Sequence, residues 1–131
     1  MKMYFSVLFL VIILTAALLS ACGGGGGEPA ATEAAPAGDP VAGKEAYDKT
    51  CIACHGPDLK GMTGLGKDLT TSEFVASQSD EELVAFILVG RPASDPANTQ
   101  GVDMPPKGGN PSLTEEDLLN IVAYMRSMQA P

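Results

Sequence analysis

Two cysteines and a histidine make up the segment of this chain with the most specific chemistry. Cys51 and Cys54 are three positions apart and His55 follows directly. This pattern attaches a c-type haem, with each thiol forming a thioether and the imidazole binding the iron. Side chains at positions i and i+3 share one side of a helical turn, so both sulfurs can reach one porphyrin edge. We therefore expect a covalently bound haem here.

Other chemistries use the same residue types. The chain has three cysteines and one histidine. Because Cys22 belongs to a separate signal described below, a zinc site here would have only Cys51, Cys54 and His55 as its soft ligands. A structural zinc site takes four ligands. A redox dithiol belongs near alternating strands and helices, and the sequence shows no convincing strand. A disulfide between Cys51 and Cys54 would leave the histidine unexplained, so haem is the favoured interpretation.

The first part of the chain has the layout of a secretion signal. Lys2 precedes an uncharged apolar run over residues 3–21, which ends Leu-Ser-Ala just before Cys22. This ending resembles the lipobox of bacterial lipoproteins, which implies that residues 1–21 are removed and Cys22 is lipidated. The alternative is an uncleaved anchor helix, because the run is long enough to span a bilayer. Both interpretations place the rest of the chain at the outer, periplasmic side of a cell membrane.

Residues 22–38 are expected to be a linker that starts at the lipidated Cys22. Five glycines over residues 23–27 are followed mainly by Ala, Pro, Glu and Thr, a composition that cannot bury enough apolar surface to fold. A flexible linker of this length reaches roughly 20 Å. Residues 39–131 remain as one small domain with little apolar core of its own, and a buried macrocycle would supply much of the missing core.

Two helices can be placed from their end signals. Asp39 is a typical N-cap, and Pro40 at the first helical position costs no hydrogen bond, so a helix is expected to run from there into the haem motif. Ser79 and Glu82 form a capping box at the start of a second helix, which Gly90 ends. A short turn over residues 72–77 is expected to precede this second helix.

A third helix is expected near the C-terminus. Thr114 is its N-cap and Asp117 its third helical residue, while Leu113 lies where a hydrophobic staple begins. Its apolar stripe has helical spacing and contains Leu118, Ile121, Val122, Met125 and Met128. Two long irregular stretches, residues 56–69 and 91–112, separate the helices, and wrapping a cofactor would explain loops of this length.

In this order of elements the chain resembles a class I cytochrome c over residues 40–129. The order is a first helix, Cys-x-x-Cys-His, a glycine-rich loop, a middle helix, a Met-Pro loop and a last helix. The resemblance implies an all-α fold of three main helices whose long loops wrap one covalently bound haem c. It also implies that the first and last helices cross closely, with Gly43 and Tyr124 at the corresponding places. A solvent-exposed Gly43 is the alternative.

The resemblance further implies that Met104 is the second axial ligand of the iron. Met104 precedes Pro105, which favours an extended backbone, as in the family's Met-Pro ligand loop. The alternatives are Met62 or an iron without a methionine ligand. Met125 and Met128 are better explained by core packing, because they continue the apolar stripe of the last helix.

One position departs from the family's usual pattern. Class I cytochromes c usually have a proline after the glycine-rich loop, whose carbonyl accepts the ring N–H of the iron-binding histidine. Lys67 stands in that place in this sequence. An acceptor for the second ring nitrogen is still expected, and the candidates are the carbonyl of Lys67, that of Pro57, or another residue.

A haem with both His55 and Met104 bound has no free coordination position, so the implied function is electron transfer and not enzyme catalysis. The resemblance implies a bacterial respiratory or photosynthetic electron carrier, either tethered and mobile or a subunit of an oxidase or of a quinol-oxidising complex such as alternative complex III. The alternative is a five-coordinate haem that senses a gas or processes peroxide.

The charge balance indicates the kind of partner. The chain carries 8 lysine and arginine residues against 16 aspartate and glutamate residues, which gives a formal charge of −8. Removal of Lys2 with the signal makes the chain more acidic still. A redox partner with a basic docking face is expected, although acidic surfaces also favour solubility. Nucleic acid is not an expected partner of so acidic a domain, and no small-molecule substrate is expected.

Overall fold

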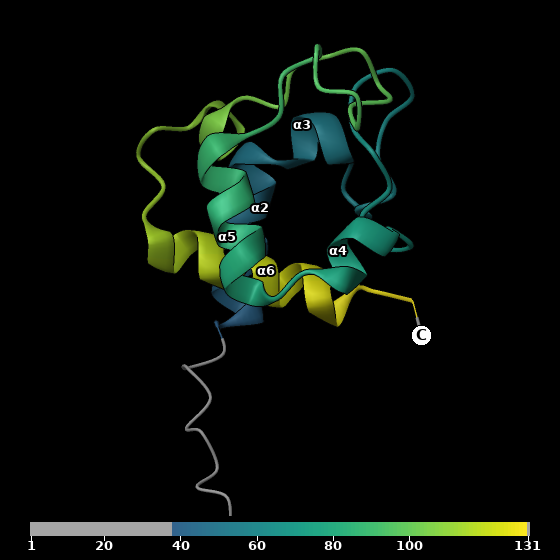
Figure 1. Cartoon of the computed structure of the whole chain (residues 1–131). Helices are drawn as coiled ribbons and strands as arrows, with labels where there is room; N and C mark the ends of the chain where they lie inside the picture. Colours follow the sequence, from purple (N-terminus) through teal and green to yellow (C-terminus); the bar gives the residue numbers. More distant parts are fainter. Residues whose placement is uncertain (1–37, 131) are drawn as a thin grey trace, which may run out of the picture. The chain divides into compact units, whose positions relative to one another are not determined.

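The computed structural model describes residues 38–130. The signal over residues 1–21, the lipidation of Cys22 and most of the linker lie outside the described residues and stay predictions. Residues 38–130 are helical and contain no strand, which confirms the all-α expectation. The elements are α2 (Pro40–Thr50), α3 (Ile52–His55), α4 (Glu73–Ser77), α5 (Asp80–Val89), the 3-10 helix η1 (Pro106–Gly109) and α6 (Glu115–Ser127) (Figure 1).

The helix starts lie where local capping chemistry puts them. Asp39 accepts hydrogen bonds from the backbone N–H groups of Val41 and Ala42 at the start of α2. The capping box expected for Ser79 and Glu82 at α5 is complete, and the expected N-cap Thr114 pairs with Asp117 in a second capping box at α6. Each cap satisfies N–H groups that a helix leaves without partners, so these starts are fixed by a few adjacent residues.

The shorter elements refine the expectation of three main helices. The haem motif forms its own short helix, α3, directly after α2, and the turn expected over residues 72–77 is the helix α4 with Ser72 as its N-cap. The 3-10 helix η1 lies in a stretch expected to be irregular. It follows Pro105, and a helix of four residues is too short to show a periodic pattern in the sequence.

Helix α2 crosses α6 at a glycine (Figure 1). Gly43 is buried, and a Cβ atom at this position would overlap the backbone carbonyl of Asn120. Next to the crossing, the rings of Tyr47 and Tyr124 meet edge to face with centroids 5.4 Å apart. The close crossing at Gly43 is therefore confirmed, and an exposed Gly43 is wrong.

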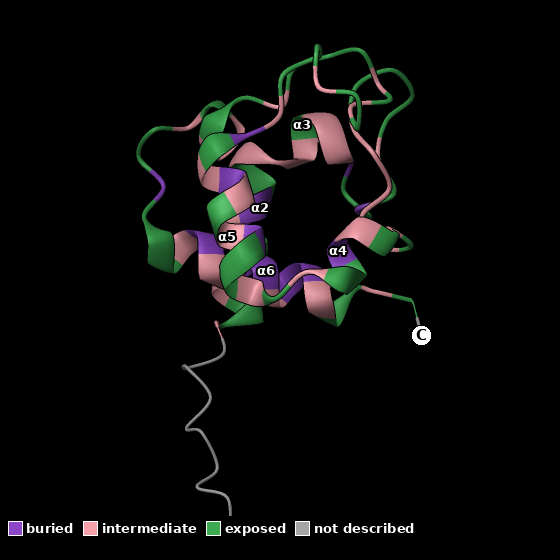
Figure 2. Cartoon of the chain, in the orientation of Figure 1, coloured by how far each residue is buried: buried purple, intermediate pink, exposed green. Residues whose placement is uncertain are grey.

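The core lies on the inward faces of α2, α4, α5 and α6 and includes two loop residues, Leu59 and Leu113 (Figure 2). Its members are buried apolar or aromatic side chains: Tyr47, Leu59, Val75, Leu83, Ile87, Leu113, Leu118, Ile121, Val122, Tyr124 and Met125. The core role expected for Met128 is wrong. Met128 is the C-cap of α6 and is 39% exposed, because the helical stripe ends one turn earlier.

Arg126 fastens α6 to the connection between α4 and α5. Its guanidinium lies 2.9 Å from the carboxylate of Asp80 and donates to the carbonyl oxygens of Val75 and Gln78. Because one guanidinium contacts three partners, the position of α6 relative to the α4–α5 connection is tightly restrained. No helix within residues 38–130 is long and apolar enough to cross a membrane.

Candidate functional site

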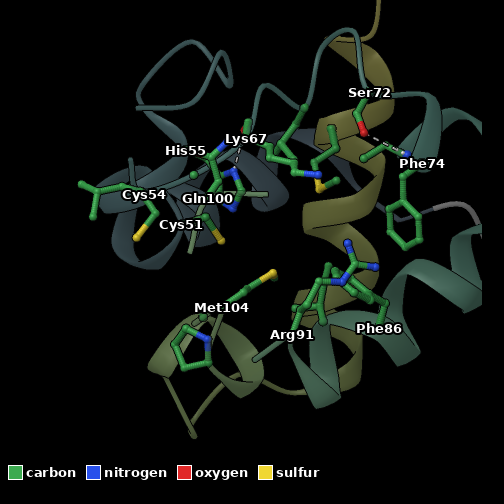
Figure 3. A pocket seen from close by; sticks show the side chains of 18 of the residues that line it. Cys51, Cys54, His55, Lys67, Ser72, Phe74, Phe86, Arg91, Gln100 and Met104 are labelled. Atoms are coloured by element: carbon green, nitrogen blue, oxygen red, sulfur yellow. Dashed lines mark hydrogen bonds between the residues drawn. The ribbon is translucent and has the colours of Figure 1, made fainter. Parts of the chain in front are cut away.

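One cavity is lined by residues from every main helix and from both long loops (Figure 3). The polar or reactive side chains among them include Cys51, Cys54, His55, Lys67, Arg91, Asp103 and Met104. The remaining wall is mainly apolar, with Leu69, Phe74, Val75, Leu83, Phe86, Ile87, Ile121 and Met125. The cavity is therefore a largely apolar chamber with a small set of chemically distinctive groups.

The two thiols enter the cavity from α3. Cys51 is the N-cap of this helix and Cys54 lies within its single turn, so both sulfurs face the same cavity, and both cysteines are free and half-buried. Burial raises the pKa of the Cys51 thiol to about 11. The thiol is therefore neutral near pH 7, whereas metal binding and disulfide exchange use the thiolate.

His55 is oriented by the backbone of Lys67. The ring nitrogen Nδ1 lies 2.9 Å from the carbonyl oxygen of Lys67. A carbonyl only accepts hydrogen bonds, so Nδ1 carries the proton and Nε2 keeps its lone pair. Burial lowers the pKa of His55, and the bond to Lys67 offsets only part of this effect. A neutral imidazole with a free Nε2 is the form that binds a metal ion.

Met104 reaches the same cavity from the loop before η1. An antiparallel bridge holds its backbone to Arg91: each residue donates its N–H to the carbonyl of the other, both at 2.8 Å. Gly90, with φ +74°, packs where any Cβ would overlap the Met104 carbonyl. Figure 3 shows the side chains of Met104 and His55 projecting into the cavity from two separate segments.

The other methionines outside the signal occupy different environments. Met62 is 45% exposed and does not line this cavity. Met125 lines the cavity but is a buried member of the core on α6. The structure therefore brings Cys51, Cys54, His55 and Met104 together, while Cys22 lies outside the described residues.

The residues of the cavity fit a haem. Two free thiols one helical turn apart, an imidazole with an available Nε2 and a thioether sulfur form the donor set of a c-type haem with two axial ligands. The apolar wall suits the faces of a macrocycle. Within residues 38–130, no three His, Cys, Asp or Glu side chains form a cluster that would hold a metal ion.

Three further residues that line the cavity, Phe74, Phe86 and Arg91, have no definite role predicted from the sequence. The guanidinium of Arg91 stacks on the rings of Phe74 and Phe86, and the two rings meet edge to face. Phe74 and Arg91 are 17 positions apart and belong to different segments, so no periodic pattern links them. The available signal was a lone cation directly after the helix-ending Gly90.

Comparison with known proteins is consistent with the interpretation of this cavity as a haem site. The family model described as Cytochrome c matches residues 40–129. Cytochrome c-555 of Chlorobaculum thiosulfatiphilum is 33% identical over 87 residues, which cover 66% of this chain and 93% of that protein. Cytochrome c-555 of Chlorobaculum tepidum is 36% identical over 87 residues, covering 66% and 74%.

A larger relative contains a similar segment. The Cbb3-type cytochrome c oxidase subunit CcoP of Rhodobacter capsulatus is 27% identical over 88 residues, which cover 66% of this chain but only 28% of that subunit. No solved structure matches the chain significantly.

Proposed function

This chain belongs to the class I cytochromes c, and from that premise we propose that it carries single electrons through one haem bound at Cys51, Cys54, His55 and Met104. The thiols of Cys51 and Cys54 would hold the haem as thioethers. His55 and Met104 would ligate its iron. The observation that carries this assignment is the meeting of all four side chains in one apolar cavity.

The hydrogen bond between His55 and Lys67 supports the role of His55. It presents Nε2 as the ligand atom and fixes the ring plane, as hydrogen bonds to the second nitrogen of metal-binding histidines generally do. The two backbone bonds between Arg91 and Met104 likewise hold the Met104 segment at the cavity. Both proposed ligands are therefore positioned by backbone groups.

A haem with histidine and methionine ligands supplies reversible one-electron exchange between ferric and ferrous iron, with the thioether favouring the ferrous state. The electron comes from a reduced partner and passes to an oxidised one. The surrounding residues need no acid, base or nucleophile, and the apolar wall keeps water away from the redox centre. With both His55 and Met104 bound, the iron would have no open position for a gas or peroxide.

We also propose that the domain is tethered outside the cytoplasm through a lipidated Cys22 and the linker that follows it. The layout of residues 1–22 supports this anchor. The partners would be redox proteins with basic docking faces, because the chain has a formal charge of −8. The relative named as a cbb3-type oxidase subunit supports either membership of an oxidase complex or a tethered carrier beside one. A quinol-oxidising complex is the other assembly that we propose.

Visible spectra of the purified protein test the haem assignment. The wild type should give a c-type reduced spectrum, and its oxidised form should show the weak near-infrared band of methionine bound to ferric haem. Met104→Leu should lose that band and its reduced form should bind carbon monoxide. Met62→Leu is the matched control, since Met62 does not line the cavity, and it should keep the band.

The outcomes separate the alternatives. If the wild type lacks the near-infrared band and binds carbon monoxide readily, the iron is open, and gas sensing or peroxide chemistry replaces electron transfer. A protein without a Soret band would rule out haem altogether. The anchor is tested separately: Cys22→Ala should release the domain from membranes, and a variant that remains in the membrane fraction would contradict lipid tethering.

A further inference from the structure

Arg91 is a partly buried cation at the wall of the haem cavity. Its side chain is only 17% exposed. The guanidinium carbon lies 4.9 Å from the ring centroid of Phe74 and 4.7 Å from that of Phe86, within the range of cation–π contacts. Because these two rings also pack edge to face, they hold the guanidinium in one orientation.

The Nε–H group of this guanidinium is buried and donates to no acceptor within residues 38–130. Asp95 is the nearest carboxylate partner, with its Oδ2 3.5 Å from Nε. The two groups are close enough to form an ion pair, but their geometry is not that of a hydrogen bond. The side chain of Asp95 is also 36% exposed. A buried donor on a charged group is costly without an acceptor, so an additional acceptor is expected at this position.

Other charged groups at the cavity already have partners. Asp103 also lines the cavity, but its carboxylate accepts from the N–H of Ala93 at 2.6 Å, and among the described residues it makes no ion pair with Arg91. Lys67 donates through Nζ to the carbonyl of Ala97. Among the cationic side chains that line the cavity in residues 38–130, Arg91 is therefore the one that is largely buried and also has an N–H group without an acceptor.

The backbone of Arg91 joins this cation to the proposed iron ligand. The two 2.8 Å bonds between Arg91 and Met104 place both residues in one small bridge. Figure 3 shows both side chains projecting from this bridge into the cavity. A group bound to the guanidinium is thus held in a fixed relation to the Met104 segment.

We propose that Arg91 binds a propionate carboxylate of the haem through its Nε–H, an inference that rests on the proposed haem function. A carboxylate is the acceptor that matches a guanidinium best, and the bond is charge-assisted. The pairing keeps the propionate ionised beside an apolar wall. The cation also opposes the extra positive charge of ferric iron, so Arg91 raises the reduction potential.

Nuclear magnetic resonance of the wild-type holoprotein tests the contact directly. In the ferrous, diamagnetic protein labelled with nitrogen-15, the Nε–H of Arg91 should give a slowly exchanging signal. It should show a nuclear Overhauser effect to propionate methylene protons. Arg91→Lys assigns the signal, because it keeps the charge but lacks this N–H. A wild-type Nε–H that exchanges rapidly or shows no such effect overturns the proposal.

Midpoint potentials measured against pH give a second test. The wild type should be flat between about pH 5 and 8, because a propionate paired with a cation ionises below this range. Arg91→Met should have a lower potential that also falls as pH rises through this window, since the unpaired propionate ionises there and its charge stabilises ferric iron. Lys44→Met removes a cation that is exposed on α2 and should leave the profile flat.

The two tests distinguish a wrong role for Arg91 from a wrong function. A wild type with normal haem spectra but no contact at Arg91 contradicts only the propionate assignment, whereas a wild type without haem contradicts the function itself. If Arg91→Met keeps the near-infrared band and a flat profile, Arg91 does not hold the propionate. If the Arg91→Met protein cannot be produced, the nuclear magnetic resonance measurement on the wild type decides whether Arg91 contacts the propionate.

Discussion

The carbonyl oxygen of Lys67 accepts a hydrogen bond from Nδ1 of His55 at 2.9 Å. The side chain of the same lysine donates through Nζ to the carbonyl of Ala97 at 3.3 Å. The usual proline of this family is thus replaced without loss of the acceptor, because every residue type provides a backbone carbonyl. The lysine additionally connects the loop behind His55 to the loop that leads to Met104.

Lys67→Pro should preserve the haem spectrum and should be more stable than Lys67→Ala by about 0.4–1 kcal/mol, because a proline restricts the unfolded chain. Among the hydrogen bonds of residues 38–130, none uses the N–H of Lys67 as donor, so a proline removes no bond. Lys67→Ala is the matched control, since both variants lose the contact to Ala97. Urea unfolding measures the difference, and a less stable Lys67→Pro would mean that the backbone at this position does not suit proline.

Local chemistry explains why much of the fold was predictable. The caps at Asp39, Ser79 and Thr114 depend on residues within three positions, and the three main helices begin where these signals place them. The thiol and histidine spacing is also local, so the side of the cavity formed by α3 was expected. Gly43 was expected at a helix crossing from the family resemblance, and the crossing is present.

The unpredicted features depend on contacts between distant segments. Leu59 is fully buried with φ 61°, in a loop that carries no periodic pattern, so nothing in the sequence marked it as core. The stacking of Arg91 on Phe74 and Phe86 likewise joins α4 to the end of α5. Met128 continued the helical stripe in sequence but lies past the end of the buried surface.

Gly43→Ala should destabilise the domain by about 1–3 kcal/mol, the usual cost of overpacking. The new methyl group would overlap the carbonyl of Asn120 and force α2 away from α6. This cost should exceed the roughly 1 kcal/mol that alanine gains over glycine in a helix. Urea unfolding followed by circular dichroism measures it.

Lys44→Ala is the control for this substitution, because it also introduces alanine into α2 but at an exposed position. Its unfolding midpoint should stay close to that of the wild type. An unchanged midpoint for Gly43→Ala itself would show that the two helices can separate without cost.

Asp117 should make stability depend on pH in the acidic range. Hydrogen bonds from the backbone N–H and then the side chain of Thr114 lower the pKa of Asp117. A lowered folded-state pKa contributes stability above the unfolded-state value of about 3.9 that is lost as pH falls through the folded-state pKa. The wild type should therefore exceed Asp117→Asn in stability at pH 7, and the difference should become smaller as the pH falls below about 3.9, so that it is reduced at pH 3.

Urea unfolding at the two pH values measures this change. Asp39→Asn provides a comparison at a different helix start, where no capping box is present. A stability difference between wild type and Asp117→Asn that persists unchanged at pH 3 would contradict a contribution from the carboxylate charge.

Tyr47→Phe should cost about 1 kcal/mol at neutral pH, the typical net contribution of one hydrogen bond. The hydroxyl of Tyr47 donates to the carbonyl of Gly56 at 2.7 Å, which ties α2 to the end of the haem motif in the core. Tyr124→Phe is the matched control, because its hydroxyl makes no hydrogen bond within residues 38–130, and it should be nearly neutral.

The cost of Tyr47→Phe should shrink at alkaline pH. Burial raises the pKa of Tyr47 above its ordinary value of 10.0. A raised folded-state pKa gives stability that is fully present below the unfolded-state pKa and is lost as pH rises through the folded-state value. The wild type should therefore lose stability relative to Tyr47→Phe above about pH 10. Urea unfolding at pH 7 and pH 11 compares the two proteins, and a constant difference between them would show that the phenol stays as easily ionised in the fold as in water.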